Sequence, residues 1–199
     1  ASLKQVDSLA LQKMKDYLPK IAVMGKSIHE SLKDGGTVYL CGCGATGRLS
    51  ISLEVFCRGG MIPAEYSEKI IGFMAGGDTA LIKSIENFED HPEYGARQLL
   101  ELGFKDGDLL ISITEGGETP FVIGATEAAA SVSKKPPWFL YCNPEAQLIE
   151  EIERSAKVIN HPGINSLSLY VGPMGLSGST RMQASTVLMA AVGWALSCG

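Results

Sequence analysis

Metal-binding and disulfide motifs are missing from this sequence. Its three histidines show no ligand spacing, and its five cysteines are odd in number and include no CxxC pair. These absences argue against a zinc site and against a disulfide framework. We therefore expect reduced thiols, no metal and no other cofactor, in a protein of the cytoplasm.

An excess of positive charge and a long apolar run are missing too. The net charge is −5 and the pI is about 5.3, which disfavours nucleic acid or an anionic membrane as a partner. The longest apolar stretch, residues 184–198, is broken by Ser185 and Thr186 and is shorter than the about 20 residues that span a bilayer. Charge occurs from Lys4 onward, so the N-terminal residues do not read as a secretion signal.

The sequence does contain a regular alternation of strand and helix patterns. Short apolar runs typical of buried parallel strands alternate with stretches of helical periodicity. The expected strands cover residues 37–42, 70–74, 108–114, 138–143 and 157–160. The expected helices between and after them cover residues 46–58, 79–89, 94–102, 119–132 and 179–199. This alternation predicts an α/β fold in which helices flank a parallel sheet.

The first 36 residues differ from the rest. Apolar residues recur at helical spacing between residues 7 and 33, and Pro19 predicts a break within this segment. The sequence DGG at residues 34–36 then ends the helix. We therefore divide the chain into an N-terminal helical segment, residues 1–36, and one compact α/β domain, residues 37–199.

A glycine-rich loop, residues 42–48 (GCGATGR), joins the first expected strand to a helix. Glycine lets the backbone approach a ligand closely, and the amides at a helix N-terminus bind anions. The spacing also fits the GxGxxG motif of dinucleotide-binding proteins, although no acid follows the second strand to hold a ribose. The predicted binding residues of this loop are Gly44, Ala45, Thr46 and Gly47.

Residues 114–119 (TEGGET) form a second loop between a strand and a helix. Pro120 suits the first turn of the following helix, and Thr119 can cap it. Glu115 and Glu118 would repel an anion, so we expect them to face solvent, hydroxyl groups of a ligand or a reacting group. The predicted binding residues of this loop are Gly116, Gly117, Glu118 and Thr119.

A third loop, residues 172–181 (GPMGLSGSTR), leads into the last helix. Arg181 lies where a cation gains nothing from the helix dipole, so an anion or a contact with another subunit would explain it. The predicted binding residues of this loop are Ser177, Ser179 and Thr180. Because ligands bind at the carboxyl ends of parallel strands, we expect the loops to contribute to one site.

Three segments taken together, GCGATGR (42–48), MAGGDTAL with IENFED (74–90) and GLSGSTRM (175–182), resemble the SIS (sugar isomerase) family. The similarity is to the branch of N-acetylmuramic acid 6-phosphate etherases and the vertebrate glucokinase regulatory protein, and it covers about residues 10–195. It implies a flavodoxin-like SIS domain that binds a hexose or hexosamine 6-phosphate, in a homodimer with its sites near the subunit interface.

The resemblance also implies a catalytic residue. The etherase eliminates lactate with two glutamates and no metal, and Glu89 matches one of these glutamates. The position of the other is held by Phe56, which cannot transfer a proton, and Glu54 turns toward another face of the helix. The second loop departs as well, since Gly116 and Glu118 stand where the etherase pattern has a serine and an arginine.

Three functions are compatible with these residues, and we rank them in the following order. A phosphosugar-binding sensor or regulator fits Phe56 and Gly116. A lyase of the etherase type needs Glu89 and a second acid from the loop at residues 114–119. An aldose–ketose isomerase needs one well-placed base, which Glu89 could supply. A nucleotide-binding domain is ranked fourth.

Overall fold

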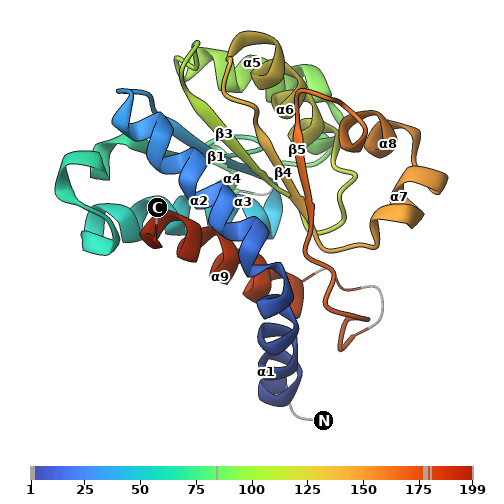
Figure 1. Ribbon diagram of the computed structural model, residues 1–199. Helices are drawn as coiled ribbons and strands as arrows, with labels where there is room; N and C mark the ends of the chain where they lie inside the picture. Colours follow the sequence, from blue (N-terminus) through green and yellow to red (C-terminus); the bar gives the residue numbers. More distant parts are fainter. Residues whose placement is uncertain (1–2, 84, 177–178, 180, 199) are drawn as a thin grey trace.

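The computed structural model describes residues 3–83, 85–176, 179 and 181–198. At its centre lies a five-stranded sheet in which all paired strands run parallel (Figure 1). The strand order, β2-β1-β3-β4-β5, is that of flavodoxin-like folds, so the predicted fold class is confirmed. The strands are β1 (Val38–Gly42), β2 (Ile70–Met74), β3 (Leu109–Ile113), β4 (Trp138–Tyr141) and β5 (Asn165–Ser168).

Helices cover both faces of this sheet (Figure 1). The helices are α1 (Leu3–Met14), α2 (Leu18–Lys33), α3 (Gly44–Phe56), α4 (Thr79–Ile82), α5 (Pro92–Glu101), α6 (Pro120–Val132), α7 (Glu145–Glu151), α8 (Glu153–Ile159) and α9 (Gln183–Cys198). Val38 and Leu40 of β1 enter one core together with residues of α1, α2, α3 and α9. Tyr39 and Cys41 point to the other face and pack with α5, α6 and α8, as the period of two along a strand requires.

The N-terminal segment consists of two helices. α1 ends at Met14, a 3₁₀ turn covers Lys15–Tyr17, and α2 has Pro19 in its first turn. Proline is tolerated there because a first-turn amide has no intrahelical acceptor. The predicted break is thus confirmed, just before Pro19. Because α2 packs against α9 and contributes to the core that β1 enters, the division of the chain after residue 36 stays a prediction.

The predicted fifth strand is wrong. Residues 157–160 belong to the end of α8 and the residue after it, and Ser155, Val158 and Ile159 are buried there at helical spacing. The fifth strand is β5, at the edge of the sheet. Its sequence, NSLS, buries only Leu167, so it lacks the continuous apolar run that marks the central strands.

Two helix boundaries also differ from the prediction. α4 ends at Ile82 and does not reach Glu89, because Lys83 is extended (φ −137°, ψ 133°) and Asn87 is left-handed (φ 63°). α9 begins at Gln183, after Met182, whose φ is 67°. The extended backbone of Lys83 ends α4, and the positive φ of Met182 is incompatible with a right-handed helix at that residue, so α9 begins after it.

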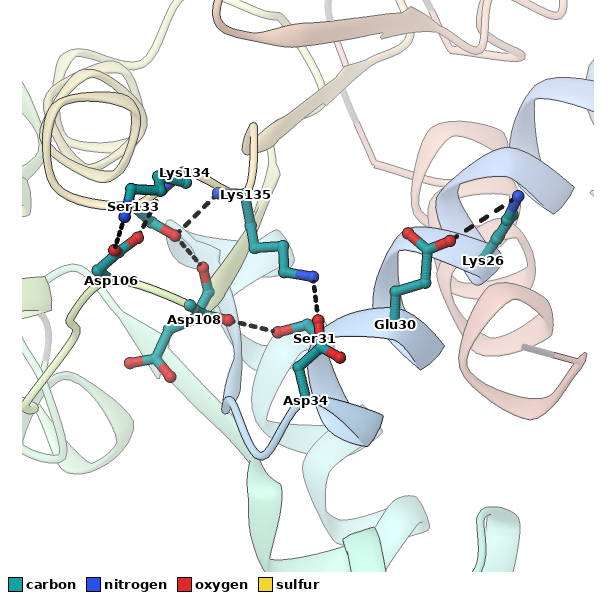
Figure 2. A network of polar contacts seen from close by, with 10 residues as sticks. Lys26, Glu30, Ser31, Asp34, Asp106, Asp108, Ser133, Lys134 and Lys135 are labelled. Atoms are coloured by element: carbon teal, nitrogen blue, oxygen red, sulfur yellow. Dashed lines mark hydrogen bonds and ion pairs between the residues drawn. The ribbon is translucent and has the colours of Figure 1, made fainter.

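A buried carboxylate holds the starts of the central strands together. Asp108 is 1% exposed, and its carboxylate accepts hydrogen bonds from the amides of Thr37 (2.8 Å) and Lys105 (2.9 Å). Its carbonyl accepts a bond from Ser133 Oγ (2.7 Å), which in turn accepts one from the amide of Lys135 (3.1 Å; Figure 2). These contacts tie together the chain just before β1, β3 and β4, at the edge of the sheet opposite their carboxyl ends.

Two glycines let α5 and α6 pack closely. A Cβ atom at Gly95 would overlap the carbonyl of Phe121, and one at Gly124 would overlap the carbonyl of Pro92. Neither glycine has a positive φ. Glycine is therefore required at both positions because there is no room for a side chain, and not because of the backbone conformation. The contact fixes the position of α6, whose N-terminus borders the site described below.

The variant Gly124→Ala is expected to lower the free energy of unfolding by about 3 kcal/mol, because the added methyl must push two helix backbones apart. Urea denaturation followed by circular dichroism measures this change. The matched control is Gly59→Ala, where an added Cβ meets no atom within 4 Å and the expected change is within about 0.5 kcal/mol. Equal stability of the two variants would contradict the proposed contact.

Candidate functional site

The carboxyl ends of β1 and β3 border a cavity of about 450 Å³, here called the first cavity. It lies where the first and second loops lead into α3 and α6. Its lining consists of Cys43, Gly44, Ala45, Thr46, Glu89, Asp90, Thr114, Glu115, Gly116, Glu118, Thr119, Pro120, Arg154 and Arg181. The structure therefore brings Glu89 together with most of the residues predicted in the first two loops.

The first loop presents the beginning of α3 to this cavity. Gly44, with a φ of 53°, and Ala45 open the helix, where backbone amides lack an intrahelical acceptor. Thr46 is 3% exposed, and its hydroxyl accepts a bond from the Cys43 amide (3.0 Å) and donates one to the Cys43 carbonyl (2.9 Å). Its hydroxyl thus caps the helix, so the groups of this loop that suit an anion are the first-turn amides.

Two of the predicted glycines pack inside the fold. Gly47 and Gly117 do not line the first cavity. A Cβ atom at Gly47 would collide with the side chain of Met74, and one at Gly117, whose φ is 82°, would collide with Leu148. Close packing therefore explains both glycines, and their part in binding stays a prediction.

The second loop is held by α8. Arg154 Nε donates to the carbonyl of Glu118 at 2.7 Å, and its terminal nitrogen lies 3.7 Å from the Glu118 carboxylate. Within the loop, the hydroxyls of Thr114 and Thr119 lie 3.2 Å apart and share a hydrogen bond. Sequence reasoning missed Arg154, because assigning residues 157–160 to a strand hid the short helix that carries it.

The third loop contributes Arg181, which lines the first cavity. No carboxylate of the described residues lies within ion-pair distance of its guanidinium, in contrast to Arg58, Arg97 and Arg154. Ser179 does not line the cavity. Ser177 and Thr180 lie outside the described residues, so the binding roles predicted for this loop stay predictions.

Glu89 lies on a 3₁₀ turn, Phe88–Asp90, that follows the left-handed Asn87. Its side chain lines both the first cavity and a second cavity of about 190 Å³. Cys43 Sγ donates a hydrogen bond to Glu89 Oε2 at 3.2 Å. Burial, and then this contact with Glu89, raise the pKa of Cys43 to about 12, so the thiol is protonated at neutral pH and is no nucleophile.

Phe56 and Glu54 lie away from the first cavity. Phe56 ends α3 and is 51% exposed. Glu54 accepts a hydrogen bond from the amide of Gly72 at 2.6 Å and pairs with Arg58 at 2.8 Å. Glu54 therefore supports strand β2, and it is not available to replace the acid that Phe56 lacks.

Acidic groups outnumber basic groups in the first cavity. Four carboxylates line it together with the guanidinium groups of Arg154 and Arg181. The Glu115 carboxylate accepts a hydrogen bond from Ser185 Oγ of α9 at 2.5 Å. Carboxylates accept hydrogen bonds from hydroxyl groups, whereas Arg181 and the first-turn amides of α3 attract an anion. This lining suits a small ligand with many hydroxyl groups and one anionic group.

Other kinds of site are not found in the part of the chain that is described. No group of three histidine, cysteine, aspartate or glutamate side chains gathers there in a way that could hold a metal ion. None of the helices in these ranges has both the length and the apolar character needed to cross a bilayer. All five cysteines are free thiols.

The fold and the cavity together define an open α/β sheet with a small-molecule site at the carboxyl ends of its strands. The family model that matches the chain is that of the glucokinase regulatory protein N-terminal SIS domain, over residues 20–130. The chain therefore belongs to the SIS family, in the branch of this regulatory protein and the N-acetylmuramic acid 6-phosphate etherases. The resemblance drawn from the loop sequences is confirmed.

Single relatives agree with this assignment. The N-acetylmuramic acid 6-phosphate etherase of Aliivibrio fischeri (strain MJ11) is 34% identical over 187 residues, covering 92% of this chain and 57% of that protein. The phosphoheptose isomerase GmhA from Neisseria gonorrhoeae aligns with a TM-score of 0.62 and 17% identity, covering 95% of this chain and 91% of that one. A phosphoheptose isomerase from Francisella tularensis aligns with a TM-score of 0.61 and 20% identity over 100% of both chains.

These relatives differ in what they establish. The chain spans only 57% of the length of the Aliivibrio fischeri etherase, so that enzyme has a further part with no counterpart in this sequence. The isomerase structures are too distant in sequence to establish more than the fold. What the chain binds must therefore be argued from its own cavity.

The variant Glu89→Gln is expected to increase the rate at which Cys43 is alkylated. At about pH 8, a pKa of about 12 leaves roughly one thiol in ten thousand ionised. Removing the Glu89 charge lowers this pKa, so the thiolate fraction at a given pH rises. Iodoacetamide labelling followed by peptide mass spectrometry measures the rate, with exposed Cys198 as internal reference.

Glu118→Gln is the matched control for this labelling. Glu118 lines the same cavity but is not among the groups that raise the Cys43 pKa. It should leave the labelling rate of Cys43 unchanged. An equal increase in both variants would show that general opening of the cavity, and not the contact between Cys43 and Glu89, governs the thiol.

Proposed function

We propose that this chain binds a hexose or hexosamine 6-phosphate in the first cavity. The observation that carries the proposal is the convergence of two groups on a cavity of about 450 Å³ that also carries four carboxylates. The groups are the α3 N-terminus and Arg181, which forms no ion pair with any carboxylate of the described residues. Membership of the SIS family and the names of its relatives, which act on sugar phosphates, support the same ligand class.

The phosphate would lie at the beginning of α3. The amides of Gly44 and Ala45 and the positive end of the helix dipole attract an anion there. Arg181 would supply the counter-charge, since no carboxylate in the described ranges neutralises it. Each hydrogen bond to a charged phosphate contributes about 1.5–3 kcal/mol, so a few such bonds suffice for micromolar binding.

The sugar ring would lie toward the carboxylates. Glu89 and Glu115 line the cavity and would accept hydrogen bonds from ring hydroxyls, which explains acids so close to a phosphate site. Thr46, Thr119, Gly44 and Gly116 would shape the cavity. We retain the homodimer, the cytoplasmic location and the absence of metal, cofactor, nucleic acid and membrane partners as parts of this proposal.

A lyase of the etherase type is the second candidate. It is favoured by Glu89, whose side chain lines the first cavity and is held by the Cys43 thiol at 3.2 Å. Elimination needs a base that takes a proton from the open-chain sugar and an acid that protonates the leaving ether oxygen. Glu118 or Glu115 of the second loop would supply the acid within the same cavity, because Glu54 lies elsewhere and Phe56 cannot transfer a proton. An aldose–ketose isomerase would need Glu89 alone as its base.

Isothermal titration of the chain with N-acetylglucosamine 6-phosphate is expected to give a dissociation constant in the range of about 1–100 μM. Arg181→Gln should weaken this binding by about 10-fold or more, because the phosphate loses a charged hydrogen-bond donor. Arg97→Gln is the control, since Arg97 is exposed and pairs with Glu101 outside the cavity. Absence of binding by every hexose and hexosamine 6-phosphate tested would reject the proposal.

Proton NMR of the chain with N-acetylmuramic acid 6-phosphate distinguishes a lyase from a binding protein. A growing lactate methyl signal would establish elimination, and Glu89→Gln should then reduce the rate by about 100-fold or more, because a general acid or base is lost. The same variant should keep ligand affinity within a few fold. Saturable binding without lactate would reject the lyase and leave the binding function in place.

A further inference from the structure

We infer that Gln183 is a positioning residue of the first cavity, which fixes the third loop so that Arg181 meets the phosphate. This inference deepens the proposed function and rests on it, because it needs a phosphate in the first cavity. Gln183 is the first residue of α9 and is 5% exposed. It does not line the first cavity, so any effect that it has on the ligand must pass through another residue.

The side-chain amide of Gln183 bonds the backbone of the third loop twice. Its Nε2 donates to the carbonyl of Pro173 at 3.1 Å, and its Oε1 accepts from the amide of Gly175 at 2.9 Å. A glutamine amide offers both a donor and an acceptor, so one side chain can bond both backbone groups. These two bonds attach the beginning of the third loop to the residue that follows its end by two positions.

α9 fixes the residue to which the loop is attached. Ala184, Val187 and Leu188 follow Gln183 and are buried in the core that β1 enters. Ser185, in the same first turn, donates its hydrogen bond to Glu115 of the second loop. The start of α9 therefore contacts both loops that bring guanidinium or carboxylate groups of this region to the first cavity.

The N-terminal helical segment holds the backbone that leads into the third loop. The Tyr17 hydroxyl donates to the carbonyl of Tyr170 at 2.7 Å, and Lys13 Nζ donates to the carbonyl of Val171 at 3.0 Å. α1, which carries Lys13, packs against α9 (Figure 1). The loop thus leaves the sheet from a backbone that is already held, and the bonds from Gln183 continue this support.

The position of Arg181 depends on these contacts. Only Met182 separates it from Gln183, and Met182 has a φ of 67°. Such a conformation is unfavourable for a residue other than glycine and persists where the surrounding structure imposes it. Arg181 forms no ion pair with a carboxylate of the described residues. The backbone, and not a salt bridge, therefore keeps its guanidinium at the first cavity.

A guanidinium held at the cavity before the ligand arrives lowers the entropy cost of binding. When the loop is released, only a fraction of the molecules present Arg181 to the cavity, and the apparent affinity falls with that fraction. The loss cannot exceed the loss caused by removing Arg181 itself. This limit separates a positioning role from a general effect on the site.

The test is a double-mutant cycle between Gln183 and Arg181, measured by isothermal titration with N-acetylglucosamine 6-phosphate. Gln183→Met keeps the shape of the side chain and removes both hydrogen bonds. It is expected to weaken binding about 5-fold, less than the about 10-fold loss expected for Arg181→Gln. In the Arg181→Gln background, the same change should alter the affinity by less than about 1.5-fold, because both substitutions act on one contact.

Two further variants support the cycle. Gln98→Met is the matched control, because Gln98 also donates to a backbone carbonyl, that of Met74 at 3.0 Å, and does not line the first cavity. It should leave the affinity unchanged within about 1.5-fold. Gln183→Asn keeps the amide but is one methylene too short to bond both groups, so it should weaken binding about 3-fold. Circular dichroism and thermal unfolding establish that each variant is folded, and Gln183→Asn takes the place of Gln183→Met in the cycle if the methionine variant is not.

Each outcome decides a different point. A loss in the Gln183 variant that disappears in the absence of Arg181 would establish the positioning role. Unchanged affinity in the Gln183 variant, or an equal loss in both backgrounds, would overturn that role and leave the proposed function standing. If the unmodified chain binds no hexose or hexosamine 6-phosphate, the proposed function is rejected and the positioning role with it.

Discussion

The buried carboxylate of Asp108 is the constraint on which the arrangement of this domain depends. Its two oxygens accept the amides of Thr37 and Lys105, which precede β1 and β3. Parallel strands that start at the same level and have equal length also end at the same level. Both strands contain five residues and are paired throughout. The first and second loops, which border the first cavity, therefore begin at the same level of the sheet.

Much of the fold could be predicted from the sequence. Strands β1 and β3 are continuous apolar runs, and each is followed by a glycine-rich turn and a helix, which is the signal of a buried parallel strand. β5 could not be predicted in this way, because it lies at the sheet edge and buries only Leu167. The short helix α8 was misread because its few apolar residues fit either period.

The candidate site was predictable only as far as local sequence determines it. Glycine next to a helix start indicated the first two loops, and these loops do border one cavity. The same local reasoning named Thr46 as a binding residue, although its hydroxyl is engaged in capping the helix. Arg154 and Cys43 could not be predicted, because their contacts with Glu118 and Glu89 join residues 36 and 46 positions apart in the chain.

The distribution of charge gives the site its discrimination. A cavity lined by carboxylates rejects most anions, so an anionic ligand can enter only where a helix N-terminus or an unpaired guanidinium compensates for its charge. In the proposed site, Arg181 meets this condition in the first cavity.

The thiol of Cys43 has a consequence for how the site responds to its surroundings. Its pKa of about 12 lies far above neutrality, so the thiol keeps its proton in the contact with Glu89 at acidic, neutral and mildly alkaline pH. A histidine at this place would change its charge within that range. Cysteine thus keeps its proton across that range, and its contact with Glu89 does not act as a pH switch near neutrality.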